Sequence, residues 1–400
     1  MQPSSFLSDA GLNQAEEEAI EIAQRLIQID TTNTGKSDTT KGERAAAEYV
    51  AELLAEVGID SESIDADPDH PERGRVSVVA RWRGSDPGQP GLVVHGHLDV
   101  VPPGEGWTHD PFGGKVADDR GDDGPEPYLH GRGAIDMKGQ VAIALATIRQ
   151  AVREGKKPPR DVVLSLFSDE EAGGTLGAQY VVKNRPDLFE GCSEVLGLEV
   201  GGFSFSLPNG KRVYLVQTGE RGMGWGEFTT KGTQGHGSQV NHDNPLVKMV
   251  SALHRLTNED SSLQAPLTDT MRQTLGTLAG GLGMEFDESD PMAVIRELGP
   301  IAKWLENSVQ SGFNLTQVHG GEKDNVVPGS TKSTVDVRPL PGQEEEFKAT
   351  VERLLGDDVE KNWKVFLNGW ENPLPTDAER AMSEAIGDQD PEALVVGWVM

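Results

Sequence analysis

The sequence predicts an α/β protein in which a doubly wound layer is interrupted by a smaller α+β sandwich. Between residues 13 and 200, apolar strand-like segments alternate with segments of helical periodicity, a pattern typical of doubly wound layers. After about Val213 the order changes to strand, strand, helix, strand, helix, strand, which is typical of a small sandwich. Helix and strand patterns return from about Asp377. We therefore expect residues 1–212 and 375–400 to form one domain, with residues 213–374 inserted into it.

The individual elements follow from apolar periodicity. Ile22, Ala23 and Leu26 recur with helical spacing, and Gly58 is suited to end a second helix. In the first domain we expect helices at 13–30, 41–57, 137–153 and 175–183, strands at 75–82, 91–96, 161–168 and 194–200, and a long loop at 102–133. In the inserted domain we expect two strands within 212–232, a helix at 244–256, a weakly patterned insert at 258–312, a strand at 331–341, a helix at 344–356 and a strand at 362–370.

The chain is strongly acidic. Its net charge is −29, from 65 acidic and 36 basic residues. Nucleic-acid binding is disfavoured because phosphate contacts need Lys and Arg. A disordered acidic tail does not fit, since the acids are spread along the chain and 36% of the residues are hydrophobic. The charge favours a protein adapted to concentrated salt, where screening reduces self-repulsion. An ordinary acidic protein is the alternative.

Three further features of the sequence bear on the cellular compartment of the protein. No stretch of about 18 apolar residues is present, so no membrane span is expected. The first residues lack a basic segment followed by an apolar one, so no signal peptide is expected. Cys192 is the only cysteine, which rules out an internal disulfide and a cysteine metal cluster. We expect a cytoplasmic protein, in a high-salt cytosol.

The segment LVVHGHLDVVPPGEGW, residues 92–107, places an imidazole and a carboxylate at the end of an apolar strand. His97 and Asp99 are two residues apart, so on an extended strand they project from the same face. Further acids follow other predicted strands or precede a helix, namely Asp136, Asp169, Glu170, Glu171 and Glu199. Carboxylates gathered at one edge repel one another unless a cation is present, and histidine with carboxylates suits Zn²⁺, Co²⁺ or Mn²⁺.

Each of these residues alone has an ordinary structural interpretation. His97 fits a core or turn histidine, Asp99 a turn residue, and Asp136 a helix N-cap. The pair Glu170–Glu171 fits the solvated first turn of a helix. Glu199, which follows an apolar segment, is harder to explain in this way. Because the pattern recurs at separate strand ends, we favour a metal site.

Three motifs in this order, GHLDVVP, GRGAIDMKG and DEEAGG, resemble the M20 metallopeptidases. The segment HGGEKDNVVPGSTKSTVDVRPLPG in the second domain is also similar to this family, which includes aminoacylase, acetylornithine deacetylase, succinyl-diaminopimelate desuccinylase and glutamate carboxypeptidase. The resemblance implies a catalytic domain of the phosphorylase/hydrolase-like zinc peptidase type, with an inserted lid and dimerisation domain. It also implies a homodimer, a small-molecule amide or peptide substrate, and a cis peptide bond after Asp136.

The resemblance assigns roles to the acids and to His97. His97 and Glu199 should bind the first metal, Glu171 the second, and Asp136 should bridge both. Asp99 should orient His97 by accepting a hydrogen bond from its ring. Glu170 should be the general base, which takes a proton from the attacking water and passes it to the leaving nitrogen.

Three residues of the second domain are also implied. His236, in KGTQGHGS, matches a histidine that reaches the partner subunit's site and stabilises the oxyanion. Asn325 and Arg338 match substrate-facing positions, and Arg is suited to bind a substrate carboxylate through two hydrogen bonds. A surface-loop histidine and an ordinary ion pair on a strand are the alternatives for His236 and Arg338.

The family has two zinc ions per subunit, and its second metal has a further histidine ligand near the C-terminus. No histidine follows His319 here, so Asp136 and Glu171 alone remain for the second site. We expect the 400-residue chain to bind one metal well and the second poorly. Two hypotheses remain open: a metal-dependent N-acyl amino acid deacylase or di- or carboxypeptidase, and a catalytically impaired or truncated homologue that kept the fold as a binding or decayed protein.

Overall fold

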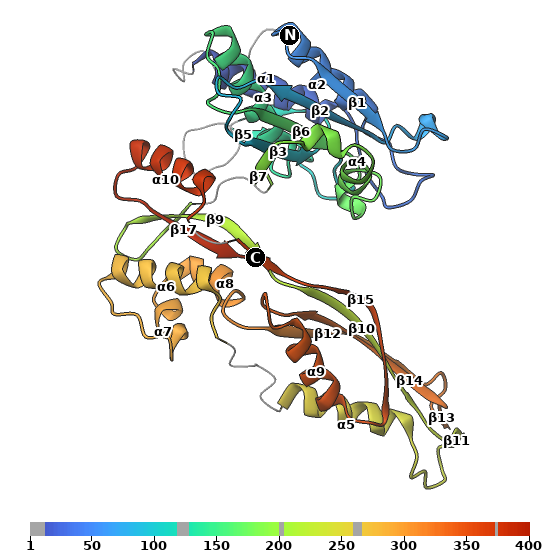
Figure 1. Ribbon diagram of the computed structural model, residues 1–400. Coiled ribbons are helices and arrows are strands. Elements are labelled where there is room, and N and C mark those ends of the chain that lie inside the picture. Colours follow the sequence, from blue (N-terminus) through green and yellow to red (C-terminus); the bar gives the residue numbers. More distant parts are fainter. Residues whose placement is uncertain (1–12, 118–127, 200–203, 259–265, 373–374) are drawn as a thin grey trace. The chain divides into compact units, whose positions relative to one another are not determined.

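The computed structural model describes residues 13–117, 128–199, 204–258, 266–372 and 375–400 (Figure 1). The chain divides into two compact units, residues 1–201 and 202–400, and each has its own sheets and apolar core. The predicted boundaries at 212 and 374 stay a prediction. Among the described residues, no helix is both long and apolar enough to cross a membrane.

The first unit is built on a five-stranded sheet with the strand order β1-β2-β6-β3-β7. Its strands are β1 (Ser61–Asp65), β2 (Val76–Trp82), β3 (Gly91–His97), β6 (Val162–Phe167) and β7 (Cys192–Gly197). β3 runs parallel to both β6 and β7, whereas β2 is antiparallel to β1 and β6. Because β3, β6 and β7 run in one direction, the segments that follow them emerge at the same edge of the sheet.

Helices cover both faces of this sheet, as the doubly wound prediction requires (Figure 1). Val76, Val78 and Ala80 of β2 face one core, whereas Val79 belongs to the core on the other face. The larger core lies under α1 (Gln14–Gln28), α2 (Arg44–Glu56) and α3 (Lys138–Arg153), and the smaller one lies under α4 (Ala178–Asn184).

Local signals fix the ends of these helices. Asn13 and Glu16 form a capping box at the start of α1, in which the Asn13 side chain accepts from the backbone N–H of Glu16 at 3.1 Å and the Glu16 carboxylate accepts from the N–H of Asn13 at 2.8 Å. α2 ends at Glu56, shortly before Gly58, whose φ of 77° lies in the left-handed region.

The long loop contains a short hairpin of β4 (Lys115–Ala117) and β5 (Tyr128–His130). Short 3₁₀ helices are η1 (Pro71–Arg73), η3 (Glu170–Ala172) and η4 (Pro186–Phe189).

The second unit contains an antiparallel sheet with the order β12-β14-β10-β15. Phe228, Met249, Val335 and Phe347 lie in the core between this sheet and two helices. The elements are β10 (Met223–Lys231), α5 (Pro245–Asn258), β12 (Gly312–Gly320), β14 (Ser330–Arg338), α9 (Glu344–Leu355) and β15 (Val359–Leu367), and β11 (Gly235–His236) pairs with β13 (Val326–Val327).

A second sheet in this unit is centred on β9 (Arg212–Glu220). β9 pairs with β8 (Ser204–Ser206), β16 (Trp370–Glu371) and, in parallel, β17 (Leu394–Val399). Val213, Met271, Leu298 and Trp398 share the core on one face. This core is covered by α6 (Asp269–Leu282), α7 (Pro291–Arg296), η5 (Gly299–Ile301) and α8 (Ala302–Glu306), and α10 (Asp377–Gln389) precedes β17.

The predicted α/β class and the α+β sandwich are confirmed, with three differences. The segment 258–312, expected to be weakly structured, contains three α-helices among its described residues. β1 and β12 were not expected, and neither were the shorter strands β4, β5, β8, β11 and β13. β9 was expected in the sandwich sheet but pairs with β17, because the two strands share an apolar face under α6.

Candidate metal centre

The six site residues predicted in the first domain come together at one edge of its sheet. They are supplied by the segments after β3, β6 and β7 and by the segment before α3, and they are His97, Asp99, Asp136, Glu170, Glu171 and Glu199. His97 and Asp99 are buried, whereas the side chains of Asp136, Glu170 and Glu199 are 50%, 46% and 40% exposed. A buried imidazole therefore faces carboxylates that solvent can reach.

The His97 ring is oriented by Asp99. Its Nδ1 lies 3.0 Å from the backbone oxygen of Asp99 and 3.5 Å from Oδ1 of the same residue. Because a carbonyl oxygen only accepts hydrogen bonds, Nδ1 carries a proton. Nε2 lies 3.0 Å from Oδ1 of Asp136, and 3.9 Å from both Oε2 of Glu170 and Oε1 of Glu199. The lone pair of Nε2 and the carboxylate oxygens repel one another at these distances. A cation between them, either a proton or a metal ion, removes this repulsion.

The pKa of His97 reflects this surplus of negative charge. Burial alone lowers it, but hydrogen bonds to Asp136 and Asp99 outweigh burial and raise the pKa to about 11. Burial raises the pKa of Glu171 to about 7, with Asp136, Asp99 and Glu170 acting in the same direction and His97 against them. Burial and the charge of Glu199 also raise the pKa of Glu170. A site that holds a proton this firmly is suited to hold a divalent cation in its place.

The donor set fits zinc. Two overlapping groups have ligand atoms within 4.8 Å of one another: His97 with Asp136 and Glu171, and His97 with Glu170 and Glu199. Two ligands about 2.1 Å from a tetrahedral zinc ion are about 3.4 Å apart. The separations of 3.0 and 3.9 Å around Nε2 bracket that value. Imidazole and carboxylate oxygens also suit Co²⁺ and Mn²⁺.

Asp99 also anchors the turn that carries the two adjacent glutamates. Its Oδ1 accepts from the backbone N–H of Glu170 at 3.1 Å, and its Oδ2 accepts from the N–H of Glu171 at 3.1 Å. One buried carboxylate therefore orients His97 and fixes the backbone of Glu170 and Glu171. The pKa of Asp99 is held low, because hydrogen bonds from His97 and Asn33 outweigh its burial.

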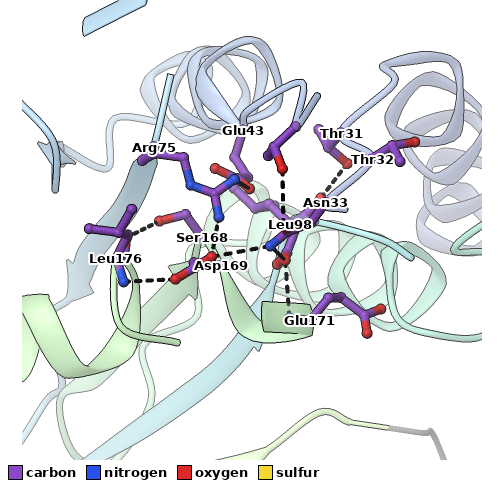
Figure 2. A network of polar contacts seen from close by, with 12 residues as sticks. Thr31, Thr32, Asn33, Glu43, Arg75, Leu98, Ser168, Asp169, Glu171 and Leu176 are labelled. Carbon is purple, nitrogen blue, oxygen red and sulfur yellow. Dashed lines mark hydrogen bonds and ion pairs between the residues drawn. The ribbon is translucent and has the colours of Figure 1, made fainter. Parts of the chain in front are cut away.

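A buried polar network joins Asp99 to Asn33, Asp169, Arg75 and Glu43, the last four of which are labelled in Figure 2. The Asn33 amide donates to Asp99 at 2.8 Å and to Asp169 at 3.2 Å. The guanidinium of Arg75 contacts Asp169 and donates to Glu43 at 2.8 Å. Sequence patterns did not point to Asn33, Glu43 or Arg75. The one signal in the sequence was Arg75 itself, a charged residue directly before the apolar strand β2.

The segment before α3 is fixed by the residues that follow Asp136. The Asp136–Met137 peptide bond is cis, as predicted, and the Met137 sulfur accepts from the backbone N–H of His97 at 3.2 Å. The fully buried Lys138 donates from Nζ to the carbonyl oxygens of Leu26 at 2.9 Å and Ile29 at 2.8 Å, at the end of α1. Burial lowers the pKa of Lys138 to about 8.

Comparisons with known proteins agree with this geometry. Residues 93–281 match the model of peptidase family M20/M25/M40, and residues 218–362 match a peptidase dimerisation domain. The chain belongs to peptidase family M20. The first match begins in β3 and includes the six predicted site residues of the first unit.

The relatives in this family include an aminoacylase and a desuccinylase. Aminoacylase-1 of Sus scrofa is 29% identical over 312 residues, which cover 78% of this chain and 63% of that protein. Succinyl-diaminopimelate desuccinylase of Methylobacterium radiotolerans is 33% identical over 249 residues, or 60% of this chain and 56% of that one. The chain therefore spans about three fifths of the length of these relatives. Human carnosine dipeptidase 1 shares the fold with a TM-score of 0.63 at 18% identity, covering 96% of this chain and 89% of that one.

The other three predicted site residues of this M20 chain lie in the second unit. His236, on β11, has Nδ1 2.8 Å from the hydroxyl of Ser238 and Nε2 3.5 Å from the amide nitrogen of Asn325. His236 and Asn325 are thus neighbours. Arg338, on β14, forms two hydrogen bonds to Asp336, at 2.7 and 3.1 Å. The structure therefore brings two of the three residues together and places Arg338 in a strand ion pair.

Proposed function

We propose that the chain is a metal-dependent hydrolase that cleaves an amide or peptide bond of a small, carboxylate-bearing substrate. The observation that carries this proposal is the orientation of His97, whose Nε2 faces Asp136, Glu170 and Glu199 while Asp99 holds Nδ1. N-acyl amino acid deacylase and di- or carboxypeptidase activity are the two forms we favour. The aminoacylase-1 relatives support the first form.

We assign the residues of the candidate site to two roles, metal binding and proton transfer. His97, Asp136, Glu171 and Glu199 would hold the metal, with Asp136 shared between two ions. A zinc ion held by these residues would lower the pKa of a bound water to about 7 and would polarise the scissile carbonyl. Glu170 takes a proton from the attacking water and delivers it to the leaving nitrogen. Within the described residues the Glu170 carboxylate accepts no hydrogen bond, which supports a proton-transfer role.

The second unit would supply the remaining groups. We assign oxyanion stabilisation to His236 of the partner subunit and substrate contacts to Asn325 and Arg338. For Arg338 this requires that a substrate carboxylate compete with Asp336 for the guanidinium.

A homodimer through the inserted domain fits this assignment. The match of residues 218–362 to a dimerisation domain supports it, as does β12, which pairs on one side only within the described sheet. Light scattering of the purified chain should give twice the monomer mass, and a monomer at every concentration would contradict the dimer.

A substrate panel tests the activity. The protein is loaded with Zn²⁺, Co²⁺ or Mn²⁺ in high salt and supplied with N-acyl amino acids, acetylornithine, succinyl-diaminopimelate and dipeptides, and release of the free amine is measured. We expect cleavage of at least one substrate, loss of activity with a chelator, and recovery when metal is added back. Metal-loaded protein that cleaves none of them would contradict the proposal. The high-salt condition follows from the charge of −29, which also leads us to propose a high-salt cytosol.

A further inference from the structure

The turn that carries Glu170 and Glu171 begins with a residue in an unfavourable backbone conformation. Asp169 has a φ of 64°, and in the described part of the chain no other non-glycine residue has a positive φ. In the left-handed region the side chain of an L-residue crowds its own backbone, so this conformation persists only where the surroundings impose it. The contacts of Asp169 therefore decide how firmly the turn is held.

Both carboxylate oxygens of Asp169 are used. Oδ1 contacts the guanidinium of Arg75 and accepts from the Asn33 amide at 3.2 Å. Oδ2 accepts from the backbone N–H of Leu176 at 2.8 Å, which ties the start of the turn to the segment before α4 (Figure 2). The next two residues, Glu170 and Glu171, donate their backbone N–H groups to Asp99. The backbone of the two glutamates is thus fastened between two buried carboxylates.

Arg75 is held in turn by Glu43. The Arg75 side chain is 4% exposed and that of Glu43 is fully buried, and Nη1 of Arg75 donates to Oε1 of Glu43 at 2.8 Å. The guanidinium thus lies between the carboxyl groups of Glu43 and Asp169, and its planar fork sets the direction of the Asp169 side chain. Among the described residues its ion pairs and side-chain hydrogen bonds are with Glu43 and Asp169, and none is with Glu170 or Glu171. Any effect of Arg75 on the glutamates passes through Asp169.

Buried ion pairs of this kind are not required for folding alone. Well-packed apolar side chains of similar volume often stabilise a protein as well or better. Here the chain of ion pairs ends on the strained residue directly before the two glutamates. Figure 2 shows Arg75 between Glu43 and Asp169, the residue at which the turn begins.

We propose that Glu43 and Arg75 are positioning residues that hold Asp169 in its left-handed conformation and thereby direct Glu170 and Glu171 toward the metal centre. The effect on metal binding rests on the proposed function, whereas the effect on the turn does not.

Arg75→Lys is the decisive variant, because lysine keeps the buried charge but cannot bind two carboxylates in the planar geometry of arginine. Arg149→Lys is the matched control. Arg149 is another buried arginine of the first unit, it pairs with Glu18 and Glu56, and it has no contact with the turn. Both variants are first compared with the wild type by thermal melting, so that a loss of stability can be separated from an effect on the turn.

Two measurements are then made on each protein. Hydrogen exchange of the metal-free protein should show faster exchange of the Glu170 and Glu171 amides in Arg75→Lys than in the wild type or in Arg149→Lys. Titration with Co²⁺ should show about tenfold weaker binding in Arg75→Lys, together with a changed visible absorption spectrum, as is common when a group that orients metal ligands is altered. Arg149→Lys should bind Co²⁺ like the wild type.

If Arg75→Lys does not fold, Glu43→Ala replaces it, since Arg75 then keeps its contact with Asp169, and the same changes are expected at smaller size.

Unchanged exchange and affinity in the Arg75 or Glu43 variant would overturn the proposal, as would equal weakening by Arg149→Lys. Absence of Co²⁺ binding by the wild type would instead contradict the proposed function, and the exchange comparison would still decide the role of Arg75.

Discussion

Glu170 and Glu171 are chemically identical neighbours that the turn places in different surroundings. The Glu171 carboxylate accepts from the backbone N–H of Val101 at 3.2 Å, whereas Glu170 lies 3.9 Å from Nε2 of His97. Glu170→Ala should lower turnover at least about 100-fold, because general-base catalysis is lost, with the metal content nearly unchanged. Glu171→Ala, the control, should lose metal. Metal analysis of dialysed protein and an amine-release assay test this prediction. Loss of metal from Glu170→Ala would mean that Glu170 is the metal ligand and Glu171 the general base.

Glu43 should make stability depend on pH. Burial raises its pKa to about 8, with Asp99 and Asp169 adding to the effect and Arg75 opposing it. The folded protein therefore keeps a proton that the unfolded chain releases near its ordinary pKa of 4.5. Stability then falls as pH rises from about 4.5 to about 8 and is constant with respect to this group above that range.

Glu43→Gln removes this titration while its side-chain oxygen can still accept from Arg75. The free energy of unfolding of the variant, relative to the wild type, should rise between these pH values by an amount on the order of a few kcal/mol. Urea titrations of both proteins at several pH values give this difference curve. A flat curve would show that Glu43 is ionised throughout.

Spacing along the chain revealed the site residues that lie at strand ends. It did not reveal the residues that hold them in place, such as Arg75 and Asn33. His97 and Asp99 share a face because they are two residues apart on one extended segment, a relation that the sequence shows directly. Arg75 meets Asp169 across 94 residues, and Asn33 meets Asp99 across 66. Such contacts depend on how strands and helices pack, so no local pattern indicates them.

At the level of elements, the junction between β6 and α4 is the tightest point near the metal centre. A Cβ added to Gly177 would overlap the carbonyl oxygen of Ser168, the residue directly before Asp169. Gly177→Ala should therefore displace the turn and destabilise the first unit by about 3 kcal/mol, the size of a severe overpacking effect.

The same substitution should weaken Co²⁺ binding, because the displaced turn carries Glu170 and Glu171. Gly88→Ala is the control: Gly88 is exposed, and its Cβ would meet only the Asp86 side chain, at 3.2 Å. Thermal melting and Co²⁺ titration measure both effects. A Gly177→Ala protein with wild-type melting and affinity would show that the junction can relax.

Elements were predictable where one periodicity ran through the whole segment. α1 and α3 have clear apolar stripes and were expected within two residues of their ends. β12 was missed because a bulge between Leu315 and Gln317 breaks the alternation of its side chains. α6 contains Gly276, Gly280 and Gly281, which lower the helical preference of a segment that is held by packing against β17.

Charge is the property that belongs to the whole molecule. With a net charge of −29, the folded chain must hold many like charges close together. Some acids are paired, as Asp67 is with Arg73 at 2.8 Å, but acids outnumber basic residues by 65 to 36. Repulsion between the unpaired acids acts over about 10 Å at 0.1 M salt and about 3 Å at 1 M. Concentrated salt should therefore stabilise the folded state.

Melting temperatures measured from molar down to millimolar KCl should fall steadily, and the protein should unfold at the lowest salt. A variant with Asp388→Lys gives a matched control. Asp388 is exposed and lies one turn after Glu384 on α10, where the two like charges repel each other; lysine at this position turns the pair into an attractive one and, near the end of the helix, is also favoured by the helix dipole. This variant should keep a higher melting temperature than the wild type at low salt and lose that advantage at molar salt, because screening removes the difference. A wild-type melting temperature that does not change with KCl would show that the surface charge is not an adaptation to salt, and equal gains of the variant at all salt concentrations would point to helix propensity as their source.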